Sequence, residues 1–531
     1  MGSPDNRYIE VWVDRVARRQ SRALIEGLNS IDIEGKAAQS PALMNIISQV
    51  ARARTKPSER KTMIRLHGDR IAAERDTWVS KNAAYYGEDR RYMRFLIPIG
   101  ARVLDLGCGT GDLLDVLEPS LGVGVDLSPA MIDRARAKHP YLTFYVGDAE
   151  DDAFLATIEG PFDYIILSDT IGLLDDIETA LGGFHRLCTP ETRLVIAYYS
   201  PIWEPVLWAA ERIKLRMPQP PINFISDTDF RNILDLSDFE AVRFEARQLI
   251  PRKIFGLGPL VNRYIAPLPI INRLCLRTYV VARSRRVQTR QDCSVSVIIP
   301  CRNERGNIES ALQRLPRFAS RMEVVFVEGN SSDGTYEECL RVRDQYADLW
   351  DIKVLKQSGK GKGDAVRKGF DVAMGNILII LDADLTVPPE ALPKFHAAIV
   401  SGKGEFVNGT RLVYPMEKEA MRPLNLIANR LFAAAFSFLI NQRFTDTLCG
   451  TKVLTDSAYR KIATQRHYFG EFDPFGDFDL ILGAAKSSLK IVEIPIHYGS
   501  RTYGETQISR FRDGMMLLRM VLFAFRKLKA V

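Results

Sequence analysis

The sequence lacks the features that mark disulfide-rich, zinc-binding and membrane-spanning proteins. Its seven cysteines are widely scattered and include no Cys-x-x-Cys pair, so neither a disulfide framework nor a zinc site is indicated. No apolar run reaches the roughly 18 residues that a spanning helix needs; the nearest candidates are 431–440 and 514–525, and Arg519 interrupts the second. The first residues show no basic start followed by an apolar core, so no signal peptide is indicated.

A large excess of charge of one sign is also missing. The formal net charge of +7 over 531 residues is mild; it suits anionic ligands or a membrane surface and does not demand nucleic acid. The chain is 46% hydrophobic and 26% charged, which excludes disorder and collagen-like repeats. Since unpaired thiols are typical of a reducing cytosol, we expect a cytoplasmic protein with no nucleic-acid partner. Peripheral contact with the inner face of the membrane stays open, and the sequence does not indicate an oligomeric state.

The length predicts more than one domain. Apolar strand-like runs that alternate with helical stretches begin near residue 102 and begin again near residue 294, which predicts two doubly wound α/β domains. The string between them, RSRRVQTRQD (283–292), has Val287 as its one apolar residue and is predicted to be an exposed basic linker between separate cores. The predicted organisation is a helical extension (1–60), a first α/β domain (61–283), the linker (284–292) and a second α/β domain (293–531).

The first domain carries the string VLDLGCGTGD (103–112). In it Asp105 lies near the end of a predicted strand, and Gly107, Gly109 and Gly111 lead into a helix. Glycines there let the backbone turn sharply and let a ligand approach closely. Asp126 ends the next predicted strand, where a carboxylate can accept hydrogen bonds from both ribose hydroxyls.

Together with VGDAED (146–151) after the third strand, this set resembles class I S-adenosylmethionine-dependent methyltransferases, which have a Rossmann-like fold, over roughly residues 61–283. The resemblance implies that Asp105 and Gly107–Gly111 hold the methionine end of the cofactor, Asp126 the ribose, and Asp148–Ala149 the adenine edge. An NAD-dependent oxidoreductase is disfavoured by the GxGxG spacing and by the absence of a recognisable Tyr-x-x-x-Lys pair.

The methyl acceptor is less well defined. Ser168 and Asp169 follow the fourth predicted strand, where members of this family receive substrate, and Asp169 is either a base or a loop cap. No NPPY-type motif supports methylation of an adenine or amide nitrogen. Residues 249–277 are apolar with four prolines and two glycines; they form either a hydrophobic lid or surface patch, or a segment that packs on the sheet.

The second domain carries four further motifs, VIIPCRNERGNIE (297–309), VEGNSSDGTYE (327–337), SGKGKGDAVRKGF (358–370) and LIILDADLTVPPE (378–390). Asp382 and Asp384 follow a buried strand, where carboxylates can hold a hard divalent ion that neutralises a diphosphate leaving group. The order of motifs resembles family-two glycosyltransferases of the GT-A fold, close to dolichyl- or polyprenyl-phosphate sugar synthases, over about residues 293–531.

This resemblance implies a nucleotide-sugar donor and Mg²⁺ or Mn²⁺. It assigns Asp384 to the metal and Asp382 to the nucleotide or the metal. The base and ribose pocket would be lined by Pro300, Arg302, Glu304 and Glu328. Glu328-Gly329 stands where the family usually has Asp-Asp, which leaves the choice between uridine and guanosine open.

Three more residues concern transfer. Arg411 and Arg501 match arginines that hold phosphate in related enzymes, although a lysine common six positions after Arg501 is Gln507 here. Asp477 is the best-placed general base for a hydroxyl acceptor, whereas a phosphate acceptor is already anionic and needs none.

The sequence therefore predicts a bifunctional enzyme that transfers a sugar, with inversion, to a lipid-phosphate or glycan acceptor and also methylates a substrate. The alternative is a single glycosyltransferase whose first half is a binding or docking module. The apolar segment 511–531, flanked by basic residues, favours a lipid acceptor because such a helix can lie in a membrane interface; packing against the protein is the other reading.

Overall fold

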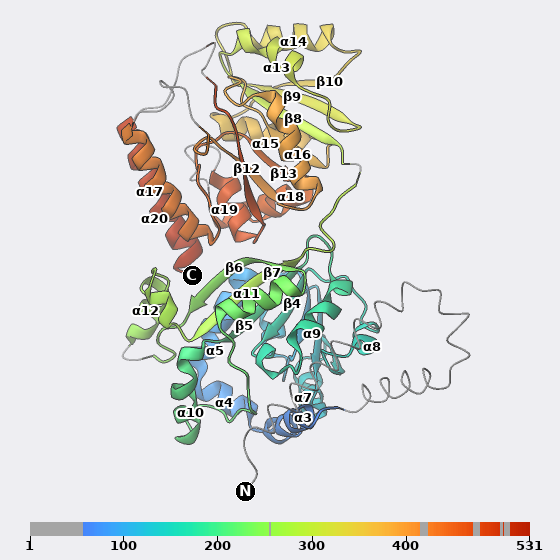
Figure 1. The fold of residues 1–531 in the computed structure, drawn as a ribbon, viewed down its shortest axis with the longest axis vertical. Coiled ribbons are helices and arrows are strands. Elements are labelled where there is room, and N and C mark those ends of the chain that lie inside the picture. The colour runs from blue at the N-terminus through green and yellow to red at the C-terminus, as the bar shows by residue number, and fades with distance from the viewer. Residues whose placement is uncertain are drawn as a thin grey trace, which may run out of the picture. The chain divides into compact units, whose positions relative to one another are not determined.

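A computed structural model describes residues 57–253, 256–291, 293–414, 423–470, 478–499, 503 and 510–531. The chain divides into a unit Met1–Ile64 and a compact unit Arg65–Val531. Most of the predicted extension, residues 1–56, lies outside the described residues. The predicted α/β architecture is confirmed, because the second unit contains two seven-stranded sheets with helices packed on them (Figure 1).

The first sheet has the order β3-β2-β1-β4-β5-β7-β6, in which β7 is antiparallel to both of its neighbours. Its seven strands begin at Arg102, where the sequence predicts the first strand-like run. They are β1 (Arg102–Leu106), β2 (Leu121–Asp126), β3 (Thr143–Val146), β4 (Tyr164–Ser168), β5 (Arg193–Tyr199), β6 (Phe239–Arg247) and β7 (Arg277–Ser284).

The second sheet has the order β10-β9-β8-β11-β13-β12-β14. Its parallel strands β8 to β11 agree with the prediction, whereas β13 runs antiparallel to β11 and β12. The strands are β8 (Val295–Cys301), β9 (Met322–Glu328), β10 (Asp351–Lys356), β11 (Ile377–Ile380), β12 (Phe406–Thr410), β13 (Lys452–Thr455) and β14 (Ile491–Pro495).

Polar caps fix several helix starts. Ser128 accepts a hydrogen bond from Met131 N at the start of α7, and Asp176, Ser226 and Thr455 cap other helices in the same way. The helices of the first half are α3 (Glu59–Ile71), α4 (Arg75–Lys81), α5 (Ala83–Leu96), α6 (Asp112–Val116), α7 (Pro129–Lys138), α8 (Asp152–Leu155), α9 (Ile177–Phe184), α10 (Glu204–Arg212), α11 (Asp227–Leu236) and α12 (Leu257–Tyr264). Those of the second are α13 (Ile308–Arg314), α14 (Thr335–Gln345), α15 (Lys362–Val372), α16 (Leu392–Val400), α17 (Pro423–Ile440), α18 (Asp456–Thr464), α19 (Phe478–Lys486) and α20 (Arg510–Ala524).

The cores of the two halves are not separate, in contrast to the expectation from the basic linker. One apolar cluster contains buried residues of both sheets, among them Val195 and Val281 of the first and Ile298 and Val325 of the second. The connecting residues from 285 onward are also tied to the first half, because Arg285, Arg286 and Arg290 form ion pairs with Asp235, Asp238 and Glu191.

A buried ion pair joins the two sheets. The guanidinium of Arg193 in β5 donates to Glu405, which precedes β12, at 2.6 Å, and the two side chains are 2% and 9% exposed. Arg283 at the end of β7 lies 3.7 Å from the other oxygen of Glu405. Burial opposes ionisation of Glu405, but the two arginines outweigh it and lower the pKa of this carboxyl.

A second buried network surrounds Glu245 in β6. This carboxylate accepts hydrogen bonds from Arg247 at 2.7 Å, Asn441 at 2.7 Å and Tyr92 at 3.0 Å. Lys529, in the π-helical turn Phe525–Lys529 that follows α20, lies 3.5 Å away. Burial lowers the pKa of Lys529 to about 8. The end of the second half is thus held by residues of the first.

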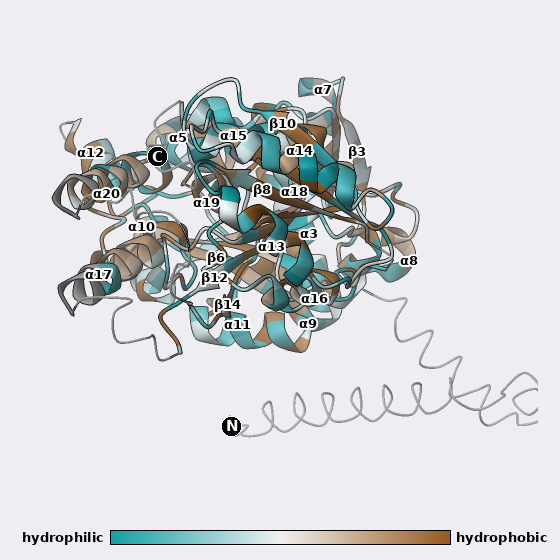
Figure 2. Ribbon diagram, turned by 90° about the horizontal axis from the view of Figure 1, so that it is seen from above, coloured by the Kyte–Doolittle hydropathy of each residue, from teal (hydrophilic) through white to brown (hydrophobic). Residues whose placement is uncertain are grey.

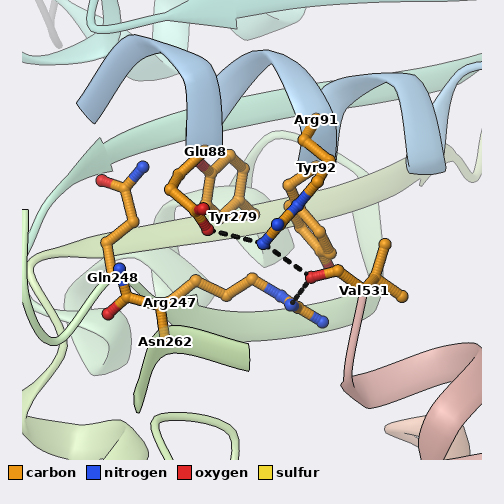
Figure 3. Close-up of a pocket in the computed structure, with 8 residues that line it drawn as sticks. All are labelled: Glu88, Arg91, Tyr92, Arg247, Gln248, Asn262, Tyr279 and Val531. Carbon is orange, nitrogen blue, oxygen red and sulfur yellow. Dashed lines mark hydrogen bonds and ion pairs between the residues drawn. The ribbon is translucent and has the colours of Figure 1, made fainter. Parts of the chain in front are cut away.

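A small pocket adjoins this network (Figure 3). Arg91 and Arg247 donate to the main-chain oxygen of Val531 at 2.9 and 3.4 Å. None of the residues predicted to bind a cofactor or a sugar lines the pocket, so we assign it no catalytic role. It is lined by Glu88, Arg91, Tyr92, Arg247, Gln248, Asn262, Tyr279 and Val531.

Replacing Glu405 should destabilise both halves together. Glu405→Ala leaves Arg193 buried without its counter-ion, which costs about 3–5 kcal/mol, whereas Arg283 keeps its ion pair with Glu240. We expect a lower urea midpoint and a single earlier calorimetric transition. The matched control is Glu390→Ala, which removes an exposed pair with Arg314 and should cost less than about 1 kcal/mol. Equal effects of the two substitutions would contradict the structural role of Glu405.

Candidate functional site

Glycines build a tight turn between β1 and α6. Gly107, Gly109 and Gly111 all have positive φ, at 86°, 54° and 78°, a region that side chains with a Cβ rarely adopt. A Cβ at Gly107 would lie 2.1 Å from the Thr170 hydroxyl oxygen. The three predicted glycines therefore form one turn at the carboxyl end of the central strand, as the motif requires.

Two unsatisfied polar atoms lie at this turn. Asp105 is buried, and its Oδ1 has no hydrogen-bond partner among the described residues; the same holds for Nε of Arg75 in α4. The guanidinium carbon of Arg75 would lie 2.9 Å from a Cβ on Gly109, so its side chain lies over the turn. Burial, followed by the charge of Asp126, raises the pKa of Asp105 to about 7. An unsatisfied carboxyl oxygen and an unsatisfied guanidinium nitrogen thus flank the turn.

Asp126 is fixed at the end of β2. One carboxylate oxygen accepts from Gly109 N and the other from Ser128 N, both at 2.9 Å. Burial raises the pKa of Asp126, although these two hydrogen bonds oppose the shift. Asp148 follows β3 and accepts from Glu150 N at 2.9 Å, and Ala149 between them is 7% exposed. The carboxyl ends of adjacent strands thus carry Asp105, Asp126 and Asp148, as predicted.

A cluster of tyrosines surrounds a buried arginine at the ends of β4 and β5. Arg277 is fully buried and donates to Asp169 at 2.8 Å and to the Ser168 hydroxyl at 2.7 Å. The hydroxyl of Tyr85 in α5 also contacts Arg277, and it donates to Tyr199 at 2.9 Å. Asp169 therefore forms an ion pair with Arg277, as Asp89 does at 3.1 Å, and is not only a loop cap.

In the second half, Asp382 and Asp384 follow β11. Lys362 at the start of α15 forms an ion pair with Asp382 at 2.6 Å. Burial disfavours the ionised form of Asp382, but Lys362 outweighs it and lowers the pKa of this carboxyl, so the group is anionic at neutral pH. Asp384 accepts from the main-chain N and the hydroxyl of Thr386 at 3.1 and 2.8 Å. Within the described ranges, no group of three or more His, Cys, Asp and Glu side chains could hold a metal.

The ends of β8 and β9 bring the predicted nucleotide residues together. Cys301, which follows Pro300, is in register with Glu328, and a Cβ on Gly329 would lie 3.2 Å from the Cβ of Arg302. Glu304 accepts from Asn307 at 2.7 Å, and its main-chain N donates to Thr335. Glu328 is 2% exposed. The side chains of Glu304 and Glu328 are thus held by local contacts at one sheet edge, Glu328 by the main-chain N of Ser331, whereas Arg302 is exposed.

Arg411 is held by an acid that the sequence motifs do not include. The carboxylate of Asp446 accepts hydrogen bonds from Nε and Nη2 of Arg411, at 2.7 and 2.8 Å, and also from the main-chain N of Arg411. The two other residues predicted to act in transfer, Asp477 and Arg501, lie outside the described residues, and their roles stay predictions.

Sequence reasoning missed Arg75, Lys362, Arg277 and Asp446. Lys362 lies within the motif SGKGKGDAVRKGF (358–370), so its position after two glycines could have indicated a role in the site. Arg75 and Arg277 lie in segments without a motif. Their roles follow from contacts with residues far away in the sequence, and such contacts cannot be predicted from a single sequence.

Comparison with known proteins agrees with both halves. Residues 296–467 match the family model for glycosyl transferase family 2, and residues 78–243 match that for a methyltransferase domain. Among relatives, a dolichol-phosphate mannosyltransferase of Pyrococcus furiosus is 29% identical over 225 residues, which are 40% of this chain and 59% of that protein. One of Mycosarcoma maydis is 27% identical over 249 residues, 44% of this chain and 80% of that protein.

The chain therefore spans less than two thirds of the Pyrococcus furiosus relative's length. Among solved structures, a SAM-dependent methyltransferase from Thermotoga maritima is 17% identical, covering 41% of this chain and 99% of that chain with a TM-score of 0.32.

Proposed function

We propose that this chain, which joins a methyltransferase domain to a glycosyl transferase family 2 domain, is a bifunctional enzyme. Its second half transfers a sugar from a nucleotide-sugar to a lipid phosphate, and its first half methylates a substrate with S-adenosylmethionine. The observation that carries the proposal is the same in each half: an aspartate at the carboxyl end of a buried strand lies beside a basic side chain, Asp105 near Arg75 and Asp382 near Lys362.

The first half has the groups that an amino-acid end of S-adenosylmethionine needs. The unsatisfied Asp105 oxygen suits the ammonium group, and the unsatisfied Arg75 nitrogen suits the carboxylate. Asp126 would accept from the ribose hydroxyls while keeping its bonds to Gly109 and Ser128, because each carboxylate oxygen has two lone pairs. The bound cofactor supplies an electrophilic methyl group. Asp169, 33% exposed and held by Arg277, would orient the acceptor.

The second half has carboxylate ligands of the kind that bind Mg²⁺ or Mn²⁺. Mg²⁺ is usually bound through one or two carboxylates plus substrate phosphates and water, and Asp382 and Asp384 supply two carboxylates. The bound ion neutralises charge that develops on the diphosphate leaving group. Pro300, Arg302 and Glu328 would line the nucleotide pocket beside it.

A lipid phosphate suits this half as acceptor. Two relatives are named dolichol-phosphate mannosyltransferases. Met515, Leu518 and Leu522 of α20 are 56%, 47% and 59% exposed, and their spacing places them on one face of the helix. None of the helices in the described ranges is long and apolar enough to cross a membrane. Because of its exposed apolar face, we propose that α20 lies on the lipid surface. Arg501 would hold the acceptor phosphate, and Asp477 would act as a base only for a hydroxyl acceptor.

Arg75→Ala should raise the calorimetric dissociation constant of S-adenosylmethionine by at least about tenfold, since a charge-assisted hydrogen bond contributes about 1.5–3 kcal/mol. Lys81→Ala, on the same helix and exposed, is the control. Asp126→Ala should have a similar effect to Arg75→Ala. Unchanged affinity in both variants would contradict the proposed cofactor site and would favour the alternative that the first half is a docking module.

The pH dependence of cofactor binding should report on Asp105. Because the pKa of its carboxyl is about 7 in the free protein, and the ammonium group needs the ionised form, affinity should fall as pH drops below about 7, approaching tenfold per unit. In Asp105→Asn the affinity should be weak and nearly independent of pH between about 5.5 and 8. The same pH profile in both proteins would contradict the role of Asp105.

Asp384→Ala should abolish metal-dependent turnover of the nucleotide-sugar, because one of the two carboxylates that hold the ion is lost. Asp351→Ala, at an exposed position of β10, should leave turnover unchanged. Binding of S-adenosylmethionine should be retained in both variants. If a chelator leaves transfer undiminished, Asp382 and Asp384 do not bind a catalytic metal.

The lipid acceptor can be tested through α20. Leu518→Ser/Leu522→Ser should reduce transfer to a long-chain polyprenyl phosphate in vesicles, while transfer to a short-chain, water-soluble analogue is retained. The control is Leu349→Ser/Met374→Ser, at two positions that are 60% and 70% exposed elsewhere in the second half. Transfer to a soluble sugar but to neither phosphate would overturn the proposed acceptor.

A further inference from the structure

The methyltransferase half has an apolar surface of its own, formed by α10 and the segment around α12. On α12, Leu257, Leu260 and Tyr264 are 58%, 56% and 44% exposed. Their spacing of three and then four residues places them on one face of the helix. Farther along the segment, Ile270 is 76% and Leu274 51% exposed. A contiguous exposed apolar surface usually marks a binding site.

Helix α10 adds to this surface. Val206 and Trp208 are 53% and 57% exposed, and Arg212 lies over the Trp208 ring, 3.9 Å from its centroid. Tryptophan with an adjacent basic residue is common where a protein meets a membrane interface. The opposite face of α10 is buried, since Leu207 packs in a cluster with Tyr85 and Leu276.

The α12 segment is held firmly in place. The side chain of Asn262 accepts from Ile250 N and donates to Ile250 O, at 2.9 and 2.8 Å. Arg263 donates to the main-chain oxygen of Ala530 at 2.7 Å, which places α12 beside the residues that follow α20. Figures 1 and 2 both show α10, α12, α17 and α20 along the same side of the unit Arg65–Val531. The exposed apolar side chains therefore belong to a well-packed segment and not to a loosely packed loop.

The α12 segment carries charge of one sign, whereas α10 carries Glu204 and Glu211 beside Arg212. From Gln248 to Gln291 the sequence contains no Asp or Glu. Arg252, Lys253 and Arg273 are exposed. Basic residues near an anionic bilayer contribute about 1 kcal/mol each to binding. A second copy of the chain is a poorer occupant, because a two-fold interface brings the same patch of both copies together and would oppose like charges.

We propose that this surface, formed by α10 and residues 257–274, docks on an anionic lipid bilayer. The inference goes beyond the proposed function, in which only the glycosyltransferase half contacts lipid. Both halves would then face one membrane. The tyrosine cluster with Arg277 and Asp169 would lie beneath α10, since Leu207 of that helix packs against Tyr85. The methyl acceptor would accordingly be a membrane-borne molecule.

Vesicle flotation of the full chain tests the proposal. Leu257→Ser/Leu260→Ser should lower partitioning onto phosphatidylcholine–phosphatidylglycerol vesicles by at least about tenfold, because two half-exposed leucines no longer enter the interface. The control Leu349→Ser/Met374→Ser should partition as the wild type does. Arg273→Glu should weaken binding to the anionic vesicles and leave binding to pure phosphatidylcholine unchanged.

A second measurement needs no assumption about how the variants fold. Brominated lipids in anionic vesicles should quench tryptophan fluorescence of the wild type, and Trp208→Phe should remove most of this quenching. Wild-type partitioning by the α12 variant, or full quenching without Trp208, would overturn the proposal. So would a loss of self-association in the α12 variant without a change in vesicle binding, which would assign the surface to a second copy. Each result can be read whether or not polyprenyl phosphate is glycosylated, so failure of the proposed function is distinguished.

Discussion

The carboxylate of Glu405 is the contact on which the arrangement of the two halves depends. It lies in the second half, yet the arginines that keep it ionised, Arg193 and Arg283, belong to the first sheet. A buried guanidinium or carboxylate without a partner is costly, so Arg193 depends on the second half for its counter-ion, while Arg283 also pairs with Glu240 of its own half. Together with the apolar cluster shared by both sheets, the pair makes one structural unit from the two halves, which match two different family models.

Most of the fold could be predicted from the sequence because the central strands are short, continuous apolar runs followed by acidic or glycine residues. This pattern located β1, β2 and β4, and it placed Asp105, Asp126 and Asp382 at strand ends. It works less well for β13, which has four residues and includes the fully buried Lys452. The Lys452 amine donates to Cys449 O, and a buried charged residue interrupts the apolar pattern on which prediction depends.

The sequence predicted only some of the residues that form each candidate site. Motifs supply groups carried by the turns at strand ends, whereas the groups opposite them come from helices and distant strands. Arg75 reaches the glycine turn from α4, and Asp446 holds Arg411 across 35 residues. The linker arginines Arg285 and Arg286 are exposed, as expected, but they pair with acids that lie about 50 residues earlier. Pairings of this kind leave no local pattern.

The distance along the chain between Arg193 and Glu405, 212 residues, has a consequence for synthesis on the ribosome. Domains generally fold from the N-terminus as the chain emerges at 5–20 residues per second, so Arg193 waits about 10–40 s for its counter-ion. During that interval the face of the first sheet that will meet the second half is open to solvent, with its arginines hydrated. The nascent methyltransferase half is then a natural client for a chaperone, and translation speed through residues 284–405 sets how long that exposure lasts.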